Sequence, residues 1–309
     1  MNNQIAISVA DLVKKYGIVK AVDNISFEVL KSELFGIIGP DGAGKTSLFR
    51  IIATLLKQDS GKAIIEGFDN VKDYREIRNI IGYMPGRFSL YQDLTVEENL
   101  KFFATIFNSD IKENYYLIKD IYDQLKPFAD RPAGKLSGGM KQKLALSCAM
   151  IHKPVVLILD EPTTGVDAVS RKEFWEMLRK LKSAGITIIV STPYMDEASL
   201  CDRVSLMQDG KIMSIDSPEN ILNSFIKDIY AIRSADMFRL NNDLQNYPSA
   251  LSVNTFGQYI HYCDKKDMIE EFELVKYLSQ LNHKDVEIKK INATIEDCFI
   301  DLMIKNAAR

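Results

Sequence analysis

The residues of this chain whose spacing could do chemistry begin with a glycine-rich segment, 39–46, of pattern G-x-x-x-x-G-K-T. Glycines allow a tight backbone path that turns successive N–H groups toward one point, where they can hold phosphate oxygens. Lys45 would reach the β- and γ-phosphates as a point charge, the Thr46 hydroxyl would hold Mg²⁺, and Ser47 would bond a further phosphate oxygen. A chance glycine-rich turn would show the same letters. The predicted phosphate-binding residues are Gly39, Pro40, Asp41, Gly42, Ala43, Gly44, Lys45, Thr46 and Ser47.

Two acids follow a continuous apolar run at 155–159. A run of this kind is typical of a central strand in a parallel sheet, whose carboxyl end carries the chemistry. Asp160 is expected to face Mg²⁺ through water, and Glu161 to orient or deprotonate an attacking water. The predicted catalytic set is therefore Lys45, Asp160 and Glu161, with Thr46 and Asp160 at the metal.

A second candidate anion site lies at 136–140, where two glycines open a predicted helix. The N–H groups of a helix N-terminus are free to bind an anion. A simple N-cap by Ser137 explains the same residues equally well on local grounds. The residues of this segment are Leu136, Ser137, Gly138, Gly139 and Met140.

The elements that must position these groups follow from the hydrophobic pattern. Alternating and continuous apolar runs predict strands, and spacing of three to four residues predicts helices. Thr95 and Glu98 have the spacing of a capping box, and Asp209-Gly210 predicts a hairpin turn. The expected strands are 5–29 (two strands), 34–38, 63–66, 80–84, 155–159, 186–191, 204–207 and 211–214, and the expected helices are 46–56, 74–79, one from 95, 141–151, 170–183 and one from 193.

The bulk properties set limits on the function. With 309 residues the chain is long enough for one large and one small domain. A net charge of -3 gives no general signal for binding nucleic acid. No secretory signal and no apolar stretch of about 20 residues is visible, which predicts a soluble chain. The four dispersed cysteines are expected to be buried and reduced, and the three histidines show no zinc spacing.

The C-terminal part, 221–309, has a pattern of its own, with a boundary predicted at 216–218. After a linking helix, the expected strands are 229–233, 251–255, 259–263 and 286–291, and the expected helices are 235–244, 268–281 and one from Thr294. This order resembles a split β-α-β sandwich. Its sequence shows no cluster of acids, bases or ligands, so we expect a docking or regulatory role.

Taken together, segments 39–46, 136–140, 160–161 and 165–167 resemble, in order and spacing, the ATP-binding subunits of ABC transporters. They match the Walker A, signature, Walker B and D-loop motifs of that family, the last with Asp167. The resemblance implies an α/β P-loop NTPase fold: a RecA-like core with an antiparallel β subdomain and a helical subdomain (about 87–152) in domain 1–220, and a small α+β domain at 221–309. Tyr16 falls where the family stacks adenine on an aromatic ring, although a turn tyrosine is otherwise more often plain packing.

The resemblance also implies the cofactors and partners. ATP and Mg²⁺ would bind between two nucleotide-binding domains arranged head to tail, with the signature segment of one domain capping the γ-phosphate held by the other. The partners would be integral-membrane permease subunits and a second nucleotide-binding domain, with no nucleic acid. The C-terminal extension resembles that of antibiotic- and multidrug-export subunits, so the expected location is cytoplasmic, peripheral on the inner face of the cell membrane.

Two positions depart from the family pattern. Gly86 stands where the family usually has a glutamine that senses Mg²⁺ and the attacking water, and Pro193 stands in place of a histidine that donates to the γ-phosphate. Loss of one preorganised donor typically costs about 100- to 1000-fold in rate. We therefore expect this chain to bind ATP and hydrolyse it slowly. A heterodimer is favoured over a homodimer, because a partner could supply one fast site completed by the signature segment of this chain.

Two other functions fit parts of the pattern. A regulatory subunit that binds ATP without hydrolysis is favoured by Gly86 and Pro193, while the retained Glu161 argues against it. A soluble ABC factor acting on ribosomes or DNA is the third, although the chain shows one cassette, no sustained heptads and no basic tail.

Overall fold

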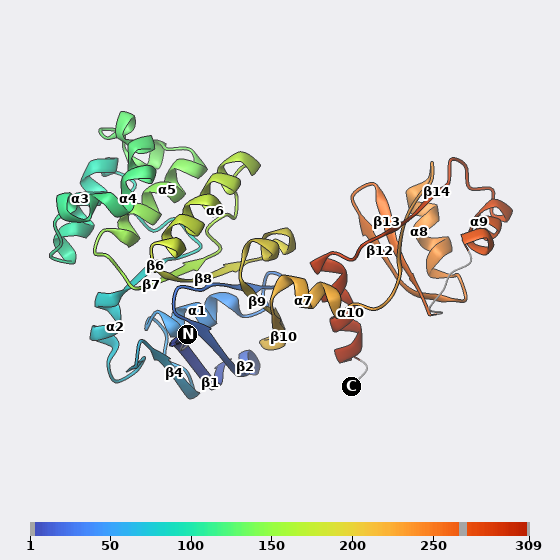
Figure 1. The fold of residues 1–309 in the computed structure, drawn as a ribbon, viewed down its shortest axis with the longest axis horizontal. Coiled ribbons are helices and arrows are strands. Elements are labelled where there is room, and N and C mark those ends of the chain that lie inside the picture. Colours follow the sequence, from blue (N-terminus) through green and yellow to red (C-terminus); the bar gives the residue numbers. More distant parts are fainter. Residues whose placement is uncertain (1–3, 266–270, 308–309) are drawn as a thin grey trace. The chain divides into compact units, whose positions relative to one another are not determined.

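The computed structural model describes residues 4–265 and 271–307, and the chain folds as two compact units, Met1–Pro218 and Glu219–Arg309 (Figure 1). The elements of the first unit form two sheets and a group of helices. The second unit has a sheet of its own. All four cysteines are buried and free of disulfides, as the sequence predicts.

The sheet that carries the candidate site has six strands in the order β10-β9-β3-β8-β7-β6. Every residue of β3, β7 and β8 is buried, as expected for central strands covered on both faces. The pairs β3–β8, β3–β9, β6–β7 and β7–β8 are parallel, and β9–β10 is an antiparallel hairpin. The bounds are Leu34–Ile38 (β3), Ile81–Met84 (β6), Val156–Asp160 (β7), Thr187–Thr192 (β8), Arg203–Gln208 (β9) and Lys211–Asp216 (β10).

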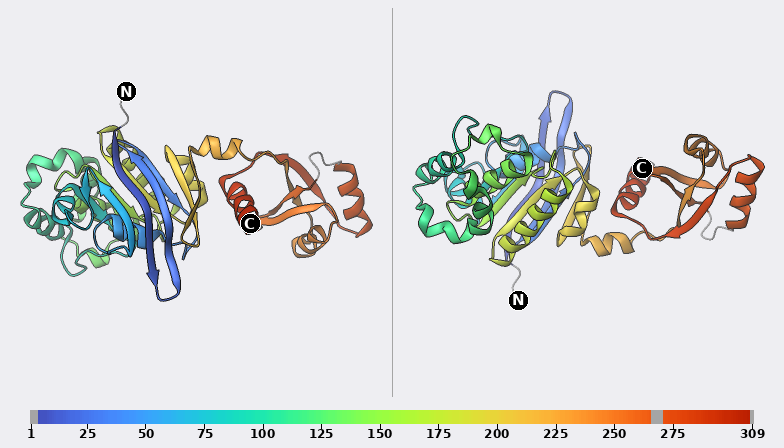
Figure 2. Two further views of the ribbon diagram at one scale, coloured as in Figure 1. Left: turned by 90° about the horizontal axis from the view of Figure 1, so that it is seen from below. Right: turned by 90° about the horizontal axis from the view of Figure 1, so that it is seen from above.

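An antiparallel sheet of order β2-β1-β4-β5 completes the strands of this unit. Strands β1 and β2 form a long hairpin whose turn projects beyond the rest of the unit (Figure 2). Side chains from both sheets and from helix α1 share one buried core. The bounds are Ile5–Tyr16 (β1), Val19–Leu30 (β2), Ser60–Ile65 (β4), Phe68–Asp69 (β5), Lys45–Ile52 (α1) and Tyr74–Ile80 (α2).

Helix α1 is shorter than the sequence predicts. The expectation of a helix over 46–56 is wrong at its end, because Thr54 adopts a left-handed backbone with φ 61. The N–H groups of Leu55 and Leu56 both donate to the carbonyl of Arg50, which closes the helix at Ile52.

Three helices, α3 to α5, lie together as a helical subdomain (Figure 1). The predicted capping box is confirmed: the Thr95 hydroxyl accepts from the N–H of Glu98, and the Glu98 carboxylate accepts from the N–H of Thr95. The predicted helix after Pro193 is a 3₁₀ helix instead. The bounds are Val96–Ile106 (α3), Ile111–Leu125 (α4), Lys126–Phe128 (η1), Ala133–Lys135 (η2), Gly138–Met150 (α5), Ala168–Ser183 (α6) and Met195–Leu200 (η3).

The second unit has the order β11-α8-β12-β13-α9-β14, followed by α10, and its antiparallel sheet runs β12-β13-β11-β14. This confirms the predicted split β-α-β arrangement. The start of the expected helix 268–281 lies outside the described residues. The bounds are Pro218–Asn223 (α7), Ile229–Arg233 (β11), Met237–Gln245 (α8), Ala250–Phe256 (β12), Tyr259–Asp264 (β13), Glu271–Gln280 (α9), Glu287–Ile291 (β14) and Ile295–Ala307 (α10).

Two separate histidine–carboxylate pairs form in the second unit. The Nδ1 atom of His261 lies 2.8 Å from Asp297 Oδ1, and the Nε2 atom of His283 lies 2.8 Å from Asp243 Oδ2. Each pair joins residues far apart in the sequence, so no local pattern could show it.

Candidate functional site

The loop between β3 and α1 requires glycine at defined positions. Gly42 and Gly44 have φ values of 82° and 103°, which side-chain-bearing residues rarely adopt. A Cβ atom on Gly39 would lie 2.1 Å from the Met207 carbonyl oxygen, and one on Gly44 would lie 1.9 Å from that of Ala21. The segment is therefore a loop held against β9 and β2, and these close backbone approaches argue against a chance turn. We call residues 39–46 the phosphate loop.

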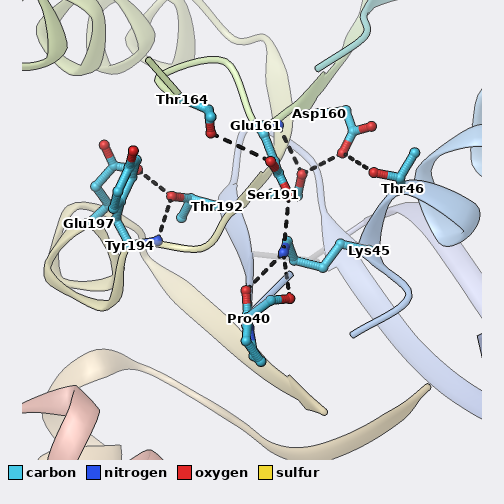
Figure 3. Close-up of polar contacts among 11 residues, drawn as sticks. Pro40, Lys45, Thr46, Asp160, Glu161, Thr164, Ser191, Thr192, Tyr194 and Glu197 are labelled. Carbon is cyan, nitrogen blue, oxygen red and sulfur yellow. Dashed lines mark hydrogen bonds and ion pairs between the residues drawn. The ribbon is translucent and has the colours of Figure 1, made fainter. Parts of the chain in front are cut away.

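Lys45 lies at the centre of the phosphate loop, and its side chain is 2% exposed. Its Nζ donates to the carbonyl oxygens of Gly39 (2.8 Å) and Pro40 (2.9 Å) and lies 3.1 Å from Glu161 Oε1 (Figure 3). The loop is thus wrapped around an ammonium group whose charge is balanced by a predicted catalytic acid.

The end of β7 presents Asp160 to the same place. Its Oδ1 accepts hydrogen bonds from the hydroxyls of Thr46 (3.2 Å) and Ser191 (2.7 Å) (Figure 3). Burial raises the pKa of Asp160 above its ordinary value, and the two hydroxyls oppose that rise. The structure therefore joins the predicted metal residues Thr46 and Asp160 directly.

Glu161 has a left-handed backbone with φ 48, which carries strain for a residue with a side chain. Its N–H donates to both the carbonyl oxygen (3.1 Å) and the hydroxyl oxygen (3.0 Å) of Ser191, the residue paired with Asp160 across β7 and β8. Ser191 thus contacts both acids. The sequence reasoning missed this residue, because only the strand register brings it there.

The two unusual positions lie at this site. A Cβ on Gly86 would be 3.1 Å from the Asp160 carbonyl oxygen and 3.7 Å from the Glu161 Cβ. Pro193 follows Thr192, whose carbonyl oxygen accepts from the N–H of Gly39 at 3.3 Å. Residue 86 therefore borders the acids, and residue 193 borders the phosphate loop.

The signature segment, 136–140, begins helix α5. Ser137 is its N-cap and accepts from the N–H of Met140 at 3.4 Å, so the local N-cap interpretation holds. A Cβ on Gly139 would lie 2.5 Å from Ser170 Oγ, which shows how closely this end of α5 packs on α6. Within the described residues no hydrogen bond joins the signature segment to the phosphate loop.

Two further predicted residues lie apart from the acids. Asp167 is the N-cap of α6, and the hydrogen bond from the Ser170 N–H to its carboxylate lowers its pKa. Tyr16 ends β1 at the projecting turn, where it is 50% exposed. The Nζ atom of Lys14 lies over this ring, 5.7 Å from its centre.

This sheet, the phosphate loop and the acids at the end of β7 define the ATP-binding cassette class of ABC transporters. A family model described as ABC transporter matches residues 22–164. The chain belongs to this family, and both the family resemblance and the predicted P-loop NTPase fold are confirmed.

Several similar proteins have names that refer to export or drug resistance. The chain is 35% identical to the Nod factor export ATP-binding protein I of Burkholderia lata over 259 residues, 82% of this chain and 85% of the relative. It is 36% identical to the daunorubicin resistance ATP-binding protein DrrA2 of Streptomyces coeruleorubidus over 222 residues, 71% and 69% of the two chains. It is 37% identical to the probable multidrug ABC transporter ATP-binding protein YbhF of Escherichia coli over 277 residues, 87% of this chain. The chain covers only 46% of that protein's length.

Solved structures agree with the fold. A structure described as the ATP-binding subunit of an ABC transporter has a TM-score of 0.65 and 26% identity, covering 71% of this chain and 93% of its own. The ADP conformation of MJ1267, an ATP-binding cassette of an ABC transporter, has a TM-score of 0.62 and 27% identity, covering 70% and 92%. Among the described residues, no helix is long and apolar enough to cross a membrane.

Proposed function

We propose that this chain binds and slowly hydrolyses ATP to drive a separate permease of an ABC exporter. The observation that carries the proposal is the buried Lys45, enclosed by the phosphate loop and paired with Glu161 beside the Thr46–Asp160 contact. One site thus presents a cation for phosphate, oxygen ligands for a metal and an acid for water.

The residues present fit Mg²⁺ and ATP. Thr46 Oγ1 and Asp160 Oδ1 lie 3.2 Å apart, so they can face one cation, and Mg²⁺ prefers oxygen ligands. When bound, Mg²⁺ neutralises phosphate charge. The positive-φ backbone of Gly42 and Gly44 gives the loop the tight path that phosphate binding requires, and Tyr16 offers a half-exposed ring to adenine.

In this mechanism Lys45 holds the terminal phosphates and Glu161 accepts a proton from the attacking water. Both groups are charged, and in the structure each balances the other. The hydroxyl of Ser191 donates to Asp160, and its hydroxyl and carbonyl oxygens accept from the N–H of Glu161, so one residue would position both acids.

Gly86 and Pro193 support slow turnover. Neither supplies a side-chain donor, and proline also lacks the backbone N–H. The second nucleotide-binding domain, a heterodimer partner in our proposal, would place its ATP under the signature segment of this chain, where the N–H groups of Gly138 and Gly139 meet a phosphate. Glu161 favours slow hydrolysis over the regulatory, non-hydrolysing alternative.

We propose that the permease docks at a cavity of about 440 Å³ beside the loop of Gly86. Its mainly apolar wall includes Met84 at the end of β6, Pro85 next to Gly86, and Phe103 and Phe107 from the helical subdomain. A cytoplasmic segment of the permease held there would touch the loop that borders Asp160. The chain would then lie on the inner face of the membrane, with Glu219–Arg309 as a docking or regulatory unit.

The experiment is single-turnover ATP hydrolysis by the purified chain, compared with the variant Gly86→Gln with Pro193→His. We expect slow hydrolysis by the unmodified chain and a rate at least about tenfold higher in the variant, because two donors to transition-state charge return. Pro193→Ala, which restores only the N–H, is the control. Steady turnover by the unmodified chain alone at an ordinary enzyme rate of about 10 per second would contradict the proposal.

A further inference from the structure

A second buried carboxylate, Glu197, lies beside the candidate site without belonging to any of the predicted motifs. It is 2% exposed and sits in the 3₁₀ helix η3. Its Oε2 accepts hydrogen bonds from the hydroxyls of Thr163 (3.0 Å) and Thr192 (2.6 Å). One carboxylate oxygen therefore joins the loop that follows the catalytic acids to the end of β8. Figure 3 shows its contact with Thr192.

A third segment reaches the same carboxylate. The Nε atom of Arg171, in the first turn of α6, lies 3.6 Å from Glu197 Oε1. Arg171 also donates to Asp196 Oδ2 at 3.1 Å, and its guanidinium lies 4.4 Å from the centre of the Tyr194 ring. Arg171 thus links helix α6 to Glu197 and to its neighbours Asp196 and Tyr194.

The residues before and after Pro193, Thr192 and Tyr194, both take part in these contacts. Thr192 Oγ1 donates to Glu197 and accepts from the N–H of Tyr194 at 3.0 Å. Pro193 itself has no N–H to donate. The segment 192–194 is therefore fixed through the Thr192 hydroxyl, which depends on the carboxylate for its partner.

We infer that Glu197 is a positioning residue for ATP hydrolysis: it locks the segment at Pro193 to the loop that carries Glu161. The inference rests on the proposed function. Burying a carboxylate costs free energy unless it is hydrogen-bonded and paired. The buried Glu197 therefore favours the arrangement in which Thr163, Thr192 and Arg171 all stay in contact with it. Thr163 is two residues beyond Glu161, so a shift of this loop moves the catalytic acid. Small displacements of a reacting group cost on the order of 100-fold in rate.

The test compares Glu197→Ala, Glu197→Gln and the neighbouring Asp196→Ala in the full-length chain. Asp196 is a matched control, because it is also an acid of η3 paired with Arg171, yet its side chain is 72% exposed. The two readouts are the affinity and stoichiometry of Mg-ATP binding and the single-turnover hydrolysis rate. A displaced catalytic acid lowers the hydrolysis rate alone, whereas a loss of folded protein lowers the binding stoichiometry as well.

We expect Glu197→Ala to keep the affinity within about twofold and to lower the rate about 10- to 100-fold. Glu197→Gln, which retains an oxygen acceptor for both threonine hydroxyls, should recover most of the rate, and Asp196→Ala should match the unmodified chain. If Glu197→Ala does not fold, Thr192→Val and Thr192→Ser decide: only the variant without the hydroxyl should be slow.

Three results would overturn the inference. One is a Glu197→Ala rate within twofold of the unmodified chain, and another is a loss of rate matched by an equal loss of binding stoichiometry. The third is equal rates for Thr192→Val and Thr192→Ser. Failure of the unmodified chain to bind ATP would instead overturn the proposed function itself, so the two failures are distinguishable.

Discussion

Asp160 holds a charge at the end of β7 that its surroundings make costly. Burial raises its pKa above the ordinary value, against the hydroxyls of Ser191 and Thr46, which lower it. A raised pKa in the folded state means that the carboxylate costs stability at neutral pH, and that this cost disappears as pH falls below the pKa of the unfolded chain, about 3.9. The Asp160 carboxylate should therefore have two opposite effects: it lowers the stability of the fold, and in our proposal it strengthens the binding of Mg-ATP.

Asp160→Asn should raise the free energy of unfolding at pH 7 when measured without nucleotide, because it removes the buried charge and keeps an oxygen acceptor. The gain should shrink as pH is lowered toward 4. The same variant should weaken Mg-ATP binding by about 10- to 100-fold, as for other residues that hold a metal through water. Urea unfolding at several pH values and nucleotide titration check both parts.

Asp167→Asn is the control with the opposite sign. The pKa of Asp167 is lowered by the backbone hydrogen bond from Ser170, so its carboxylate stabilises the fold above the unfolded pKa and loses that effect as pH falls. This variant should not be more stable at neutral pH. Equal gains in both variants would refute the burial argument for Asp160.

At the scale of single residues, the sequence predicts what lies in one contiguous motif. The phosphate loop and the two acids have spacings with a physical reason, so each could be named without coordinates. Ser191 and Glu197 could not, because their contacts depend on the register of β7 against β8 and on the fold of η3. Neither residue stands in a pattern of its own.

At the scale of elements, the contribution of the α3 capping box to the free energy of unfolding can be measured directly. Thr95→Ala removes the hydroxyl that accepts from the N–H of Glu98, and an N-cap of this kind contributes about 0.5–2 kcal/mol. We expect urea unfolding monitored by circular dichroism to report a loss in that range. Thr105→Ala in the same helix is the control, since the Thr105 hydroxyl donates back to the Lys101 carbonyl oxygen of its own helix. Equal losses would show that the cap has no special role.

The predicted bounds of the buried central strands β3, β7 and β8 agree with the structure to within one residue. Strand β3 has the predicted bounds, because a continuous apolar run between turn residues leaves little choice. The errors lie at ends. Thr54 closes α1 early through a left-handed backbone, and η3 winds as a 3₁₀ helix around the buried Glu197. Helix α1 ends through hydrogen bonds of its own last turn, which its apolar spacing does not reveal. The Glu197 carboxylate of η3 accepts from Thr163, a contact between distant segments that no local propensity contains.

At the scale of the whole molecule, the first compact unit contains every residue of the proposed nucleotide site. A fragment of residues 1–218 should therefore bind Mg-ATP with an affinity within about threefold of the full chain, since a unit with its own core can fold alone. Calorimetric titration of both proteins checks this, with Lys45→Ala in the fragment as the control. A folded fragment that binds no ATP would show that the second unit contributes to the site.

The second unit shows how far sequence reasoning reaches at this scale. Its strand and helix order predicts the sheet, but His261 and Asp297 are 36 residues apart and His283 and Asp243 are 40 apart. The first pair joins β13 to α10, and the second joins α8 to the loop that follows α9. They had no signature in the sequence.

The ion pair between Lys45 and Glu161 has one further consequence. A phosphate that takes Lys45 must compete with the carboxylate already there, so binding is an exchange of anions and its net electrostatic gain is small. In the proposed mechanism the same exchange would free Glu161 when phosphate binds. In the mechanism that we propose, Glu161 would therefore stay paired with Lys45 until a phosphate binds, which would limit its action as a proton acceptor in the absence of ATP.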